Sequence, residues 1–135
     1  MLSKHSKRFA PLLGLGLTAV TVTSVGRAAE APGYDFPAAA QEITQLFWLA
    51  ETANVCGWTN AEDVIKFKRF AMRFLGAHLS EHNREALASL VLAKGYEERV
   101  RRLAEEGASE NCASNRWRLG WVSYKTAADD HANEY

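Results

Sequence analysis

The chain has 135 residues, of which 47% are hydrophobic and 24% are charged, a composition typical of one globular domain. Its 16 basic residues balance 16 acidic ones, so it lacks the basic excess on which nucleic-acid binding depends. We therefore expect no nucleic-acid partner.

Residues 1–28 have the composition of a cleaved, Sec-type signal peptide. Lys4, Lys7 and Arg8 form a basic start, residues 9–25 are apolar or weakly polar, and small residues at 26 and 28 mark cleavage after residue 28. The apolar run is shorter than the ~20 residues of a comfortable membrane span, although an uncleaved anchor is the alternative. We predict periplasmic or secreted localisation, no stable membrane span, and a mature chain with 12 basic and 16 acidic residues.

The mature part reads as one helical domain. Residues 29–36 form a short lead-in that contains Pro and Gly, and residues 129–135 form an acidic tail. Between them, over 37–128, apolar residues recur at spacings of three and four with stop signals between the runs. The sequence predicts an all-α fold, a small bundle of four or five helices.

The first two helices follow from their caps. The first begins at Asp35 as cap and ends near Val55, and the second follows a Thr59–Glu62 capping box and ends near residue 78. The second is apolar over more than half its circumference, which predicts that it is the central helix. Lys68 falls on its apolar side, and we expect a buried stem with the ammonium in water.

The remaining helices are shorter or more polar. Ser80 caps a helix over 81–94, another covers 96–106, and Ser109 caps the last helix over 110–128. Gly95 separates the first two of these, or the two form one helix kinked at that glycine.

Cys56 and Cys112 are the only cysteines, and in an exported protein two cysteines most simply form one disulfide. The bridge would tie the end of the first helix to the start of the last.

The last helix carries its aromatic residues on one face. Trp117, Trp121 and Tyr124 share core spacing, and Gly120 between them predicts a close crossing with a neighbouring helix. The alternative is a partner-binding surface. Its candidates are Trp121 at the edge of the face with Arg118 and Lys125 beside it, and Trp48 on the polar side of the first helix.

Two further patterns bear on chemistry. Lys66, Arg69 and Arg73 form a basic stripe that is either a solvated face or a docking surface for an acidic partner. The segment 78–82 matches the H-x-x-E-H zinc peptidase pattern, with His78 and His82 as ligands and Glu81 as base. The helix boundary expected at Ser80 would break that turn, so we expect no resident metal or other cofactor.

These observations favour a non-enzymatic binding or accessory protein whose partner, a protein or small ligand of the periplasm, the sequence does not identify. In architecture the chain is similar to the small periplasmic acid-stress chaperones, which have one long-range disulfide in a helical domain of about this size. That similarity covers no sequence motif. It implies an acid-switched holdase as the alternative function, and a small zinc-binding protein or metalloenzyme is a further one.

Overall fold

The computed structural model describes residues 34–134, so the predicted signal peptide and most of the lead-in lie outside the described residues. Within 34–134 there is no strand, and the helices are α2 (Phe36–Val55), α3 (Ala61–Gly76), α4 (Glu81–Leu92), α5 (Tyr96–Glu106), α6 (Ala108–Asn111) and α7 (Asn115–Asp130). The all-α prediction is confirmed. The helix beyond the predicted four or five is α6, a single turn.

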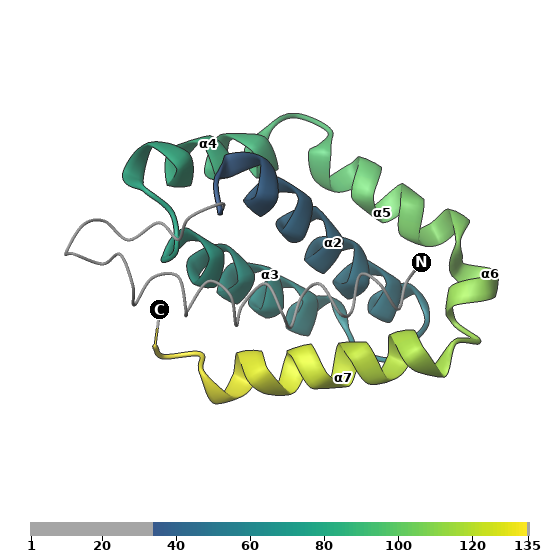
Figure 1. Cartoon of the computed structure of the whole chain (residues 1–135). Coiled ribbons are helices and arrows are strands. Elements are labelled where there is room, and N and C mark those ends of the chain that lie inside the picture. The colour runs from purple at the N-terminus through teal and green to yellow at the C-terminus, as the bar shows by residue number, and fades with distance from the viewer. Residues whose placement is uncertain (1–33, 135) are drawn as a thin grey trace.

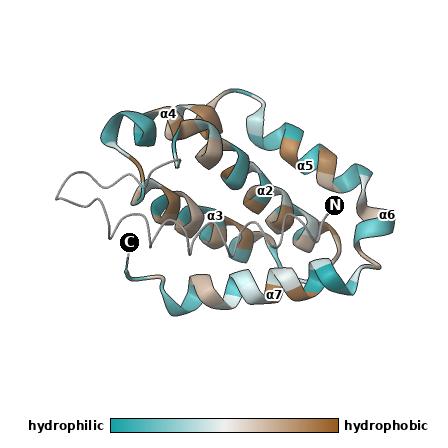
Figure 2. Ribbon diagram, in the orientation of Figure 1, coloured by the Kyte–Doolittle hydropathy of each residue, from teal (hydrophilic) through white to brown (hydrophobic). Residues whose placement is uncertain are grey.

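The central helix is α2, which contacts each of the other five helices (Figure 1). The prediction that α3 is central was wrong. Half of α2 is buried, including the small residues Ala39, Ala50 and Ala53, and these let neighbouring helices approach on several sides. Hydrophobic periodicity gives such alanines little weight, whereas it gives the large apolar residues of α3 too much. In Figure 2 the hydrophobic segments of α2 and α3 lie in the middle of the molecule.

Two of the predicted caps are confirmed. The Asp35 carboxylate accepts a hydrogen bond from the Ala38 amide at 3.2 Å, and the Ser80 hydroxyl accepts one from the Asn83 amide at 3.2 Å. Each bond satisfies an amide that has no partner within its helix.

The other two caps lie further along the chain. Asn60, not Thr59, caps α3 and accepts from the Asp63 amide at 2.8 Å. The turn that leads from α2 to this cap passes through Gly57, whose φ of 78° lies in the left-handed region. Ser114, not Ser109, caps α7 and accepts from the Trp117 amide at 3.3 Å. Ser109 lies inside α6.

Gly95 separates α4 from α5. Its φ is +83°, a conformation that interrupts a right-handed helix and that glycine adopts without strain. The two segments are therefore separate helices and not one kinked helix. On α5, Leu103 is exposed, whereas Ala104 is buried.

The predicted disulfide is present. Cys56 and Cys112 are bridged, with their Cα atoms 5.2 Å apart. The bridge joins the end of α2 to the junction between α6 and α7, at one end of the bundle (Figure 1). It thereby closes the helices that lie between them in sequence into one covalent loop.

Lys68 differs from its prediction. Only 8% of the residue is exposed, and its Nζ donates to Glu51 Oε2 at 2.5 Å and to Glu97 Oε1 at 2.7 Å. The same Nζ lies 4.9 Å from the centroid of the Phe47 ring. The ammonium is therefore held between α2 and α5 and does not reach out into water.

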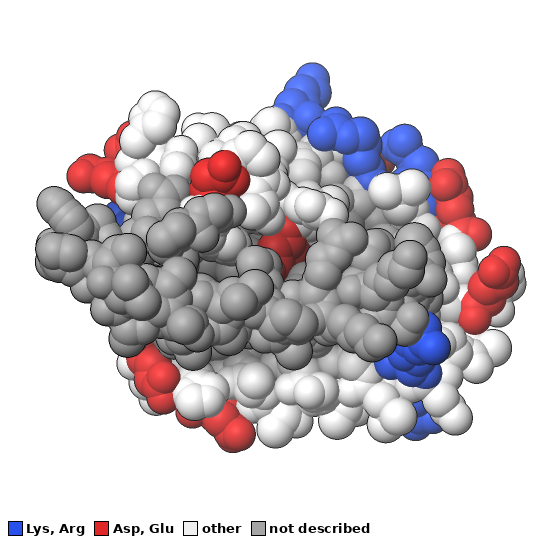
Figure 3. All heavy atoms as spheres, in the orientation of Figure 1, with Lys and Arg blue, Asp and Glu red and all other residues white. Residues whose placement is uncertain are grey.

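Most other charges lie on the surface. On the face shown in Figure 3, Lys and Arg side chains gather at the upper and lower right of the molecule, whereas Asp and Glu side chains lie at its left and right edges and at the lower left. Among residues 34–134, no helix has both the length and the apolar character that crossing a bilayer requires.

Candidate functional site

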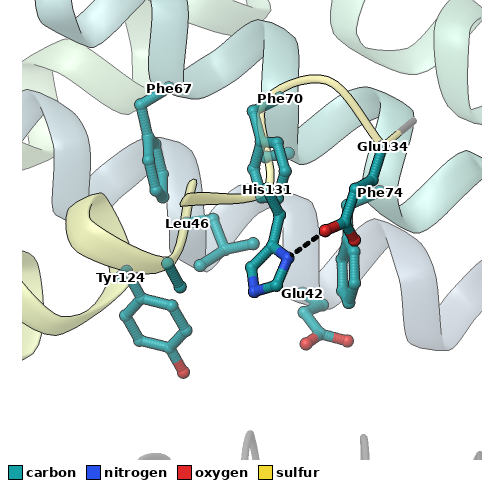
Figure 4. Close-up of a pocket in the computed structure, with 10 residues that line it drawn as sticks. Glu42, Leu46, Phe67, Phe70, Phe74, Tyr124, His131 and Glu134 are labelled. Atoms are coloured by element: carbon teal, nitrogen blue, oxygen red, sulfur yellow. Dashed lines mark hydrogen bonds and ion pairs between the residues drawn. The ribbon is translucent and has the colours of Figure 1, made fainter. Parts of the chain in front are cut away.

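A pocket of about 290 Å³ lies between α2, α3, α7 and the C-terminal segment 131–134 (Figure 4). Its lining is mainly apolar and aromatic, with a few polar groups, and consists of Glu42, Leu46, Phe67, Phe70, Ala71, Phe74, Tyr124, Ala127, His131 and Glu134. Volume and lining are those of a site for a small ligand, at the lower end of the range of known pockets.

The aromatic wall of the pocket comes from α3. Phe67, Phe70 and Phe74 recur at spacings of three and four, which places them along one side of the helix. Phe70 and Phe74 stack with their ring centroids 5.8 Å apart. Behind the wall, Phe67 packs edge to face on Trp121 of α7 at 5.0 Å, so the bundle core supports the wall.

Glu42 of α2 is the buried polar group of the pocket, with only 5% of the residue exposed. The Tyr34 hydroxyl donates to its Oε1 at 3.3 Å. Within residues 34–134, no lysine or arginine forms an ion pair with it. Burial raises the pKa of Glu42 to about 7, and the Tyr34 hydrogen bond offsets only part of that rise. The carboxyl therefore changes charge near neutral pH.

Tyr124 of α7 shares the site. Figure 4 shows its hydroxyl and the Glu42 carboxyl on the same side of the pocket. Burial, followed by the charge of Glu42, raises the pKa of the Tyr124 phenol, so this side chain stays neutral over the physiological range. It brings a hydroxyl and an aromatic ring to the pocket without adding charge.

The C-terminal segment completes the rim. His131 Nδ1 lies 2.7 Å from Glu134 Oε2, and the hydrogen bond and charge of Glu134 raise the pKa of the histidine. The Arg73 guanidinium of α3 donates to the Ala132 carbonyl at 3.4 Å. The segment predicted as a frayed tail from residue 129 is thus helical to Asp130 and then folds against α3.

The aromatic residues that were candidates for a binding surface belong largely to the core. Trp121 is 3% exposed and Trp117 is 8% exposed, so the expected position of Trp121 at the edge of its face was wrong. Trp48 is half-buried, because its ring packs edge to face on Trp117 at 4.9 Å. Trp121 contributes to the pocket only by supporting Phe67.

Gly120 makes no close helix crossing. A Cβ added at this position would meet nothing within 4 Å, so the expected socket between the tryptophans is absent. Of the two basic candidates on α7, Arg118 is exposed and Lys125 pairs with Asp129 at 2.6 Å. Neither lines the pocket.

The basic stripe of α3 faces another part of the same chain. Lys66, Arg69 and Arg73 line a second hollow of about 280 Å³, together with Asp129, Ala132 and Asn133 from the end of α7 and the segment after it. Arg73 is bonded to that segment, and Lys66 also lies 3.8 Å from Glu62 on its own helix. Two acidic residues of the same chain, Asp129 and Glu62, thus lie near the basic stripe.

The H-x-x-E-H segment runs from the turn after α3 into the first turn of α4. Ser80 is the cap of α4, so His78 precedes that helix, whereas Glu81 and His82 lie exposed in its first turn. His78 is half-buried, and its Nδ1 lies 2.9 Å from the Phe74 carbonyl. In the described part of the chain, no three His, Cys, Asp or Glu side chains come together as metal ligands.

Reasoning from sequence missed Glu42 and the pocket. One signal was available, since Glu42 precedes Leu46 by four residues, Leu49 by seven and Ala53 by eleven, all of them buried. An acidic residue at the head of a buried helical stripe is a candidate buried carboxyl. The pocket itself depends on how α7 and residues 131–134 lie across α2 and α3.

Comparisons of the chain with protein-family models, with curated proteins and with solved structures find no match.

Proposed function

We propose that the protein is an exported, non-enzymatic binding protein that holds a small, mostly apolar molecule in the pocket between α2, α3 and α7. The observation that carries this proposal is Glu42, a buried carboxyl in a mainly apolar pocket of about 290 Å³. A folded chain gains little from such a group unless something pairs with it, because a buried polar group without full compensation costs free energy. Apolar pockets with a few convergent polar groups are the usual form of ligand sites.

The lining supports binding in preference to catalysis. His131 and Glu134 form a hydrogen-bonded pair on the rim, but covalent catalysis also needs a nucleophile next to such a base. Among the described residues that line the pocket, none is a serine or cysteine, the nucleophiles that an adjacent histidine base activates. The remaining groups, one carboxyl and one phenol, are suited to orienting a ligand.

Occupation of the pocket is tested with phenethyl alcohol, a small neutral probe, by titration calorimetry. Ala127 lines the pocket from the exposed side of α7, so Ala127→Trp should block it and abolish binding. Thr126→Trp is the matched control, because residue 126 is also exposed on the same helix and does not line the pocket. Equal binding by both variants would contradict the proposed site.

Export is supported by the basic, apolar and small-residue order of residues 1–28. Intact mass spectrometry of the protein from its native compartment tests it. We expect a chain that starts at or within about three residues of Ala29. A mass that retains Met1 to Arg27 would contradict cleavage and favour the uncleaved anchor.

The holdase alternative has a separate test, an apolar-dye titration from neutral to acid pH. A chaperone of that type should expose apolar surface on acidification, and the dye signal should rise steeply. The Glu42 carboxyl acts in the opposite direction, because its raised pKa means that protonation favours the folded state. We therefore expect protonation of Glu42 to cause no rise in the dye signal.

A further inference from the structure

We infer that the ligand of this pocket is a monoamine, whose ammonium group pairs with the Glu42 carboxylate and whose apolar part lies against Phe67, Phe70 and Phe74. The inference rests on the proposed function and names its ligand class.

The charges of the lining favour a cation. Two acidic residues, Glu42 and Glu134, line the pocket, and none of the described lining residues is a lysine or an arginine. His131 is paired with Glu134, so a proton on the imidazole is balanced by that partner. Glu42 therefore remains as the acid for which residues 34–134 supply no counter-charge. An anionic ligand would meet only repulsion from it, whereas an ammonium would supply the missing partner.

The aromatic lining favours the same class. The faces of aromatic rings attract cations, and an apolar tail gains from burial against them. Three phenylalanines and Tyr124 surround the space near Glu42 (Figure 4). A carboxylate next to several rings is therefore complementary to both ends of an amine with one apolar tail.

The fold already holds one ammonium in this manner. Lys68 Nζ pairs with Glu51 at 2.5 Å and with Glu97 at 2.7 Å, and it lies 4.9 Å from the Phe47 ring centroid. The Lys68 site thus combines carboxylate and ring around an intramolecular ammonium. The pocket offers the same combination, with Glu42 as the carboxylate, and leaves the ammonium to be supplied by a ligand.

Three probes with one skeleton test the inference by titration calorimetry just above neutral pH. Phenethylamine is cationic, phenethyl alcohol is neutral and hydrocinnamate is anionic. We expect the amine to bind most tightly and the carboxylate most weakly. Glu42→Gln should lower the affinity for the amine by about tenfold or more, the usual effect of removing a hydrogen-bonded charge, and should leave the affinity for the alcohol unchanged.

Glu134→Gln is the matched control. It removes a carboxylate from the exposed rim of the same pocket, where the side chain is 55% accessible, so its effect on the amine should be much smaller. Equal affinity for amine and alcohol, or an amine affinity that Glu42→Gln leaves unchanged, would overturn the inference while the proposed function stands. Failure of all three probes to bind would overturn both. A thermal melt of Glu42→Gln, an isosteric change, checks that the variant is folded.

Discussion

Lys68 of α3 and Glu51 of α2 form an ion pair inside the bundle, with Nζ 2.5 Å from Oε2 and both side chains about nine-tenths buried. Removing one partner leaves a buried charge without compensation, which costs ~3–5 kcal/mol in comparable pairs. We therefore expect Lys68→Met to lower the free energy of unfolding by ~3 kcal/mol in urea denaturation.

The double variant Lys68→Met/Glu51→Leu should recover most of that loss, because neither charge then remains buried. Lys66→Met is the control on the same helix. Its exposed pair with Glu62 spans 3.8 Å and should contribute less than ~0.5 kcal/mol. A double variant that is no more stable than Lys68→Met would show that lost packing, and not the lost charge pair, causes the fall in stability.

The two tryptophans of α7 should contribute similarly to stability. Both are buried, and each makes an edge-to-face contact, Trp117 with Trp48 and Trp121 with Phe67. Trp117→Ala and Trp121→Ala should each cost ~3–5 kcal/mol, and Arg118→Ala, at an exposed position, should change stability by less than ~0.5 kcal/mol. Thermal melts of the three variants decide this. A Trp121→Ala melt close to that of the wild type would restore the edge position that the sequence suggested.

The parts of the fold that depend on local signals could be predicted. Capping at Asp35 and Ser80, the break at Gly95 and the pairing of Cys56 with Cys112 each depend on a few neighbouring residues or on a simple count. The cap of α3 was predicted at Thr59 but is Asn60, because the position of a cap also depends on the geometry of the turn before it. That geometry depends on Gly57, whose left-handed φ the sequence permits without requiring it.

The parts of the fold that depend on tertiary packing could not be predicted from the sequence. Lys68 lies on an apolar helical face, a pattern equally compatible with a head in water and with an ion pair to Glu51 and Glu97. The partners come from two other helices, so only the assembled bundle distinguishes the two outcomes. The pocket around Glu42 has the same origin, because its rim includes residues 131–134, which the sequence indicated only as a polar end.

Gly120 is a position where a substitution should stabilise the fold. It lies in the interior of α7, and an added Cβ would meet nothing within 4 Å. Gly120→Ala should therefore raise the free energy of unfolding by ~0.5–1 kcal/mol, through better helix propensity and a less flexible unfolded chain. Gly95→Ala is the opposite control, since its φ of +83° strains any residue with a Cβ. Differential scanning calorimetry should show the two melting temperatures move in opposite directions. A fall for Gly120→Ala would indicate a close contact at that position.

Reduction of the Cys56–Cys112 bridge should lower stability substantially. The bridged residues are 56 positions apart, and closing a loop of that length stabilises the folded state by ~4 kcal/mol on the chain-entropy model. Such a loss is a large share of the ~5–15 kcal/mol typical of a domain. Urea denaturation of Cys56→Ser/Cys112→Ser, compared with the oxidised wild type, measures it. Coincident denaturation curves would show that the bridge adds nothing to stability.

The Glu42 carboxyl should make the domain more stable in mild acid than at alkaline pH. Its pKa rises from 4.5 to about 7 on folding because the group is buried, so the folded state binds the proton more tightly than the unfolded state does. The resulting stability is fully present below pH 4.5 and is lost as the pH rises through about 7. The difference amounts to about 3 kcal/mol. The groups around Glu42 are Tyr34 and Tyr124, which stay neutral over this range, and the His131–Glu134 pair on the rim.

Urea denaturation at about pH 5 and about pH 8, in the wild type and in Glu42→Gln, isolates this contribution from that of the other titrating groups. The wild type should lose more stability than the variant between the two pH values, because glutamine stays neutral at both. An equal loss would mean that Glu42 is as well solvated in the folded chain as in the unfolded one. A smaller loss in the wild type would mean that a cationic partner already compensates the carboxylate, and that would also remove the charge argument for an amine ligand.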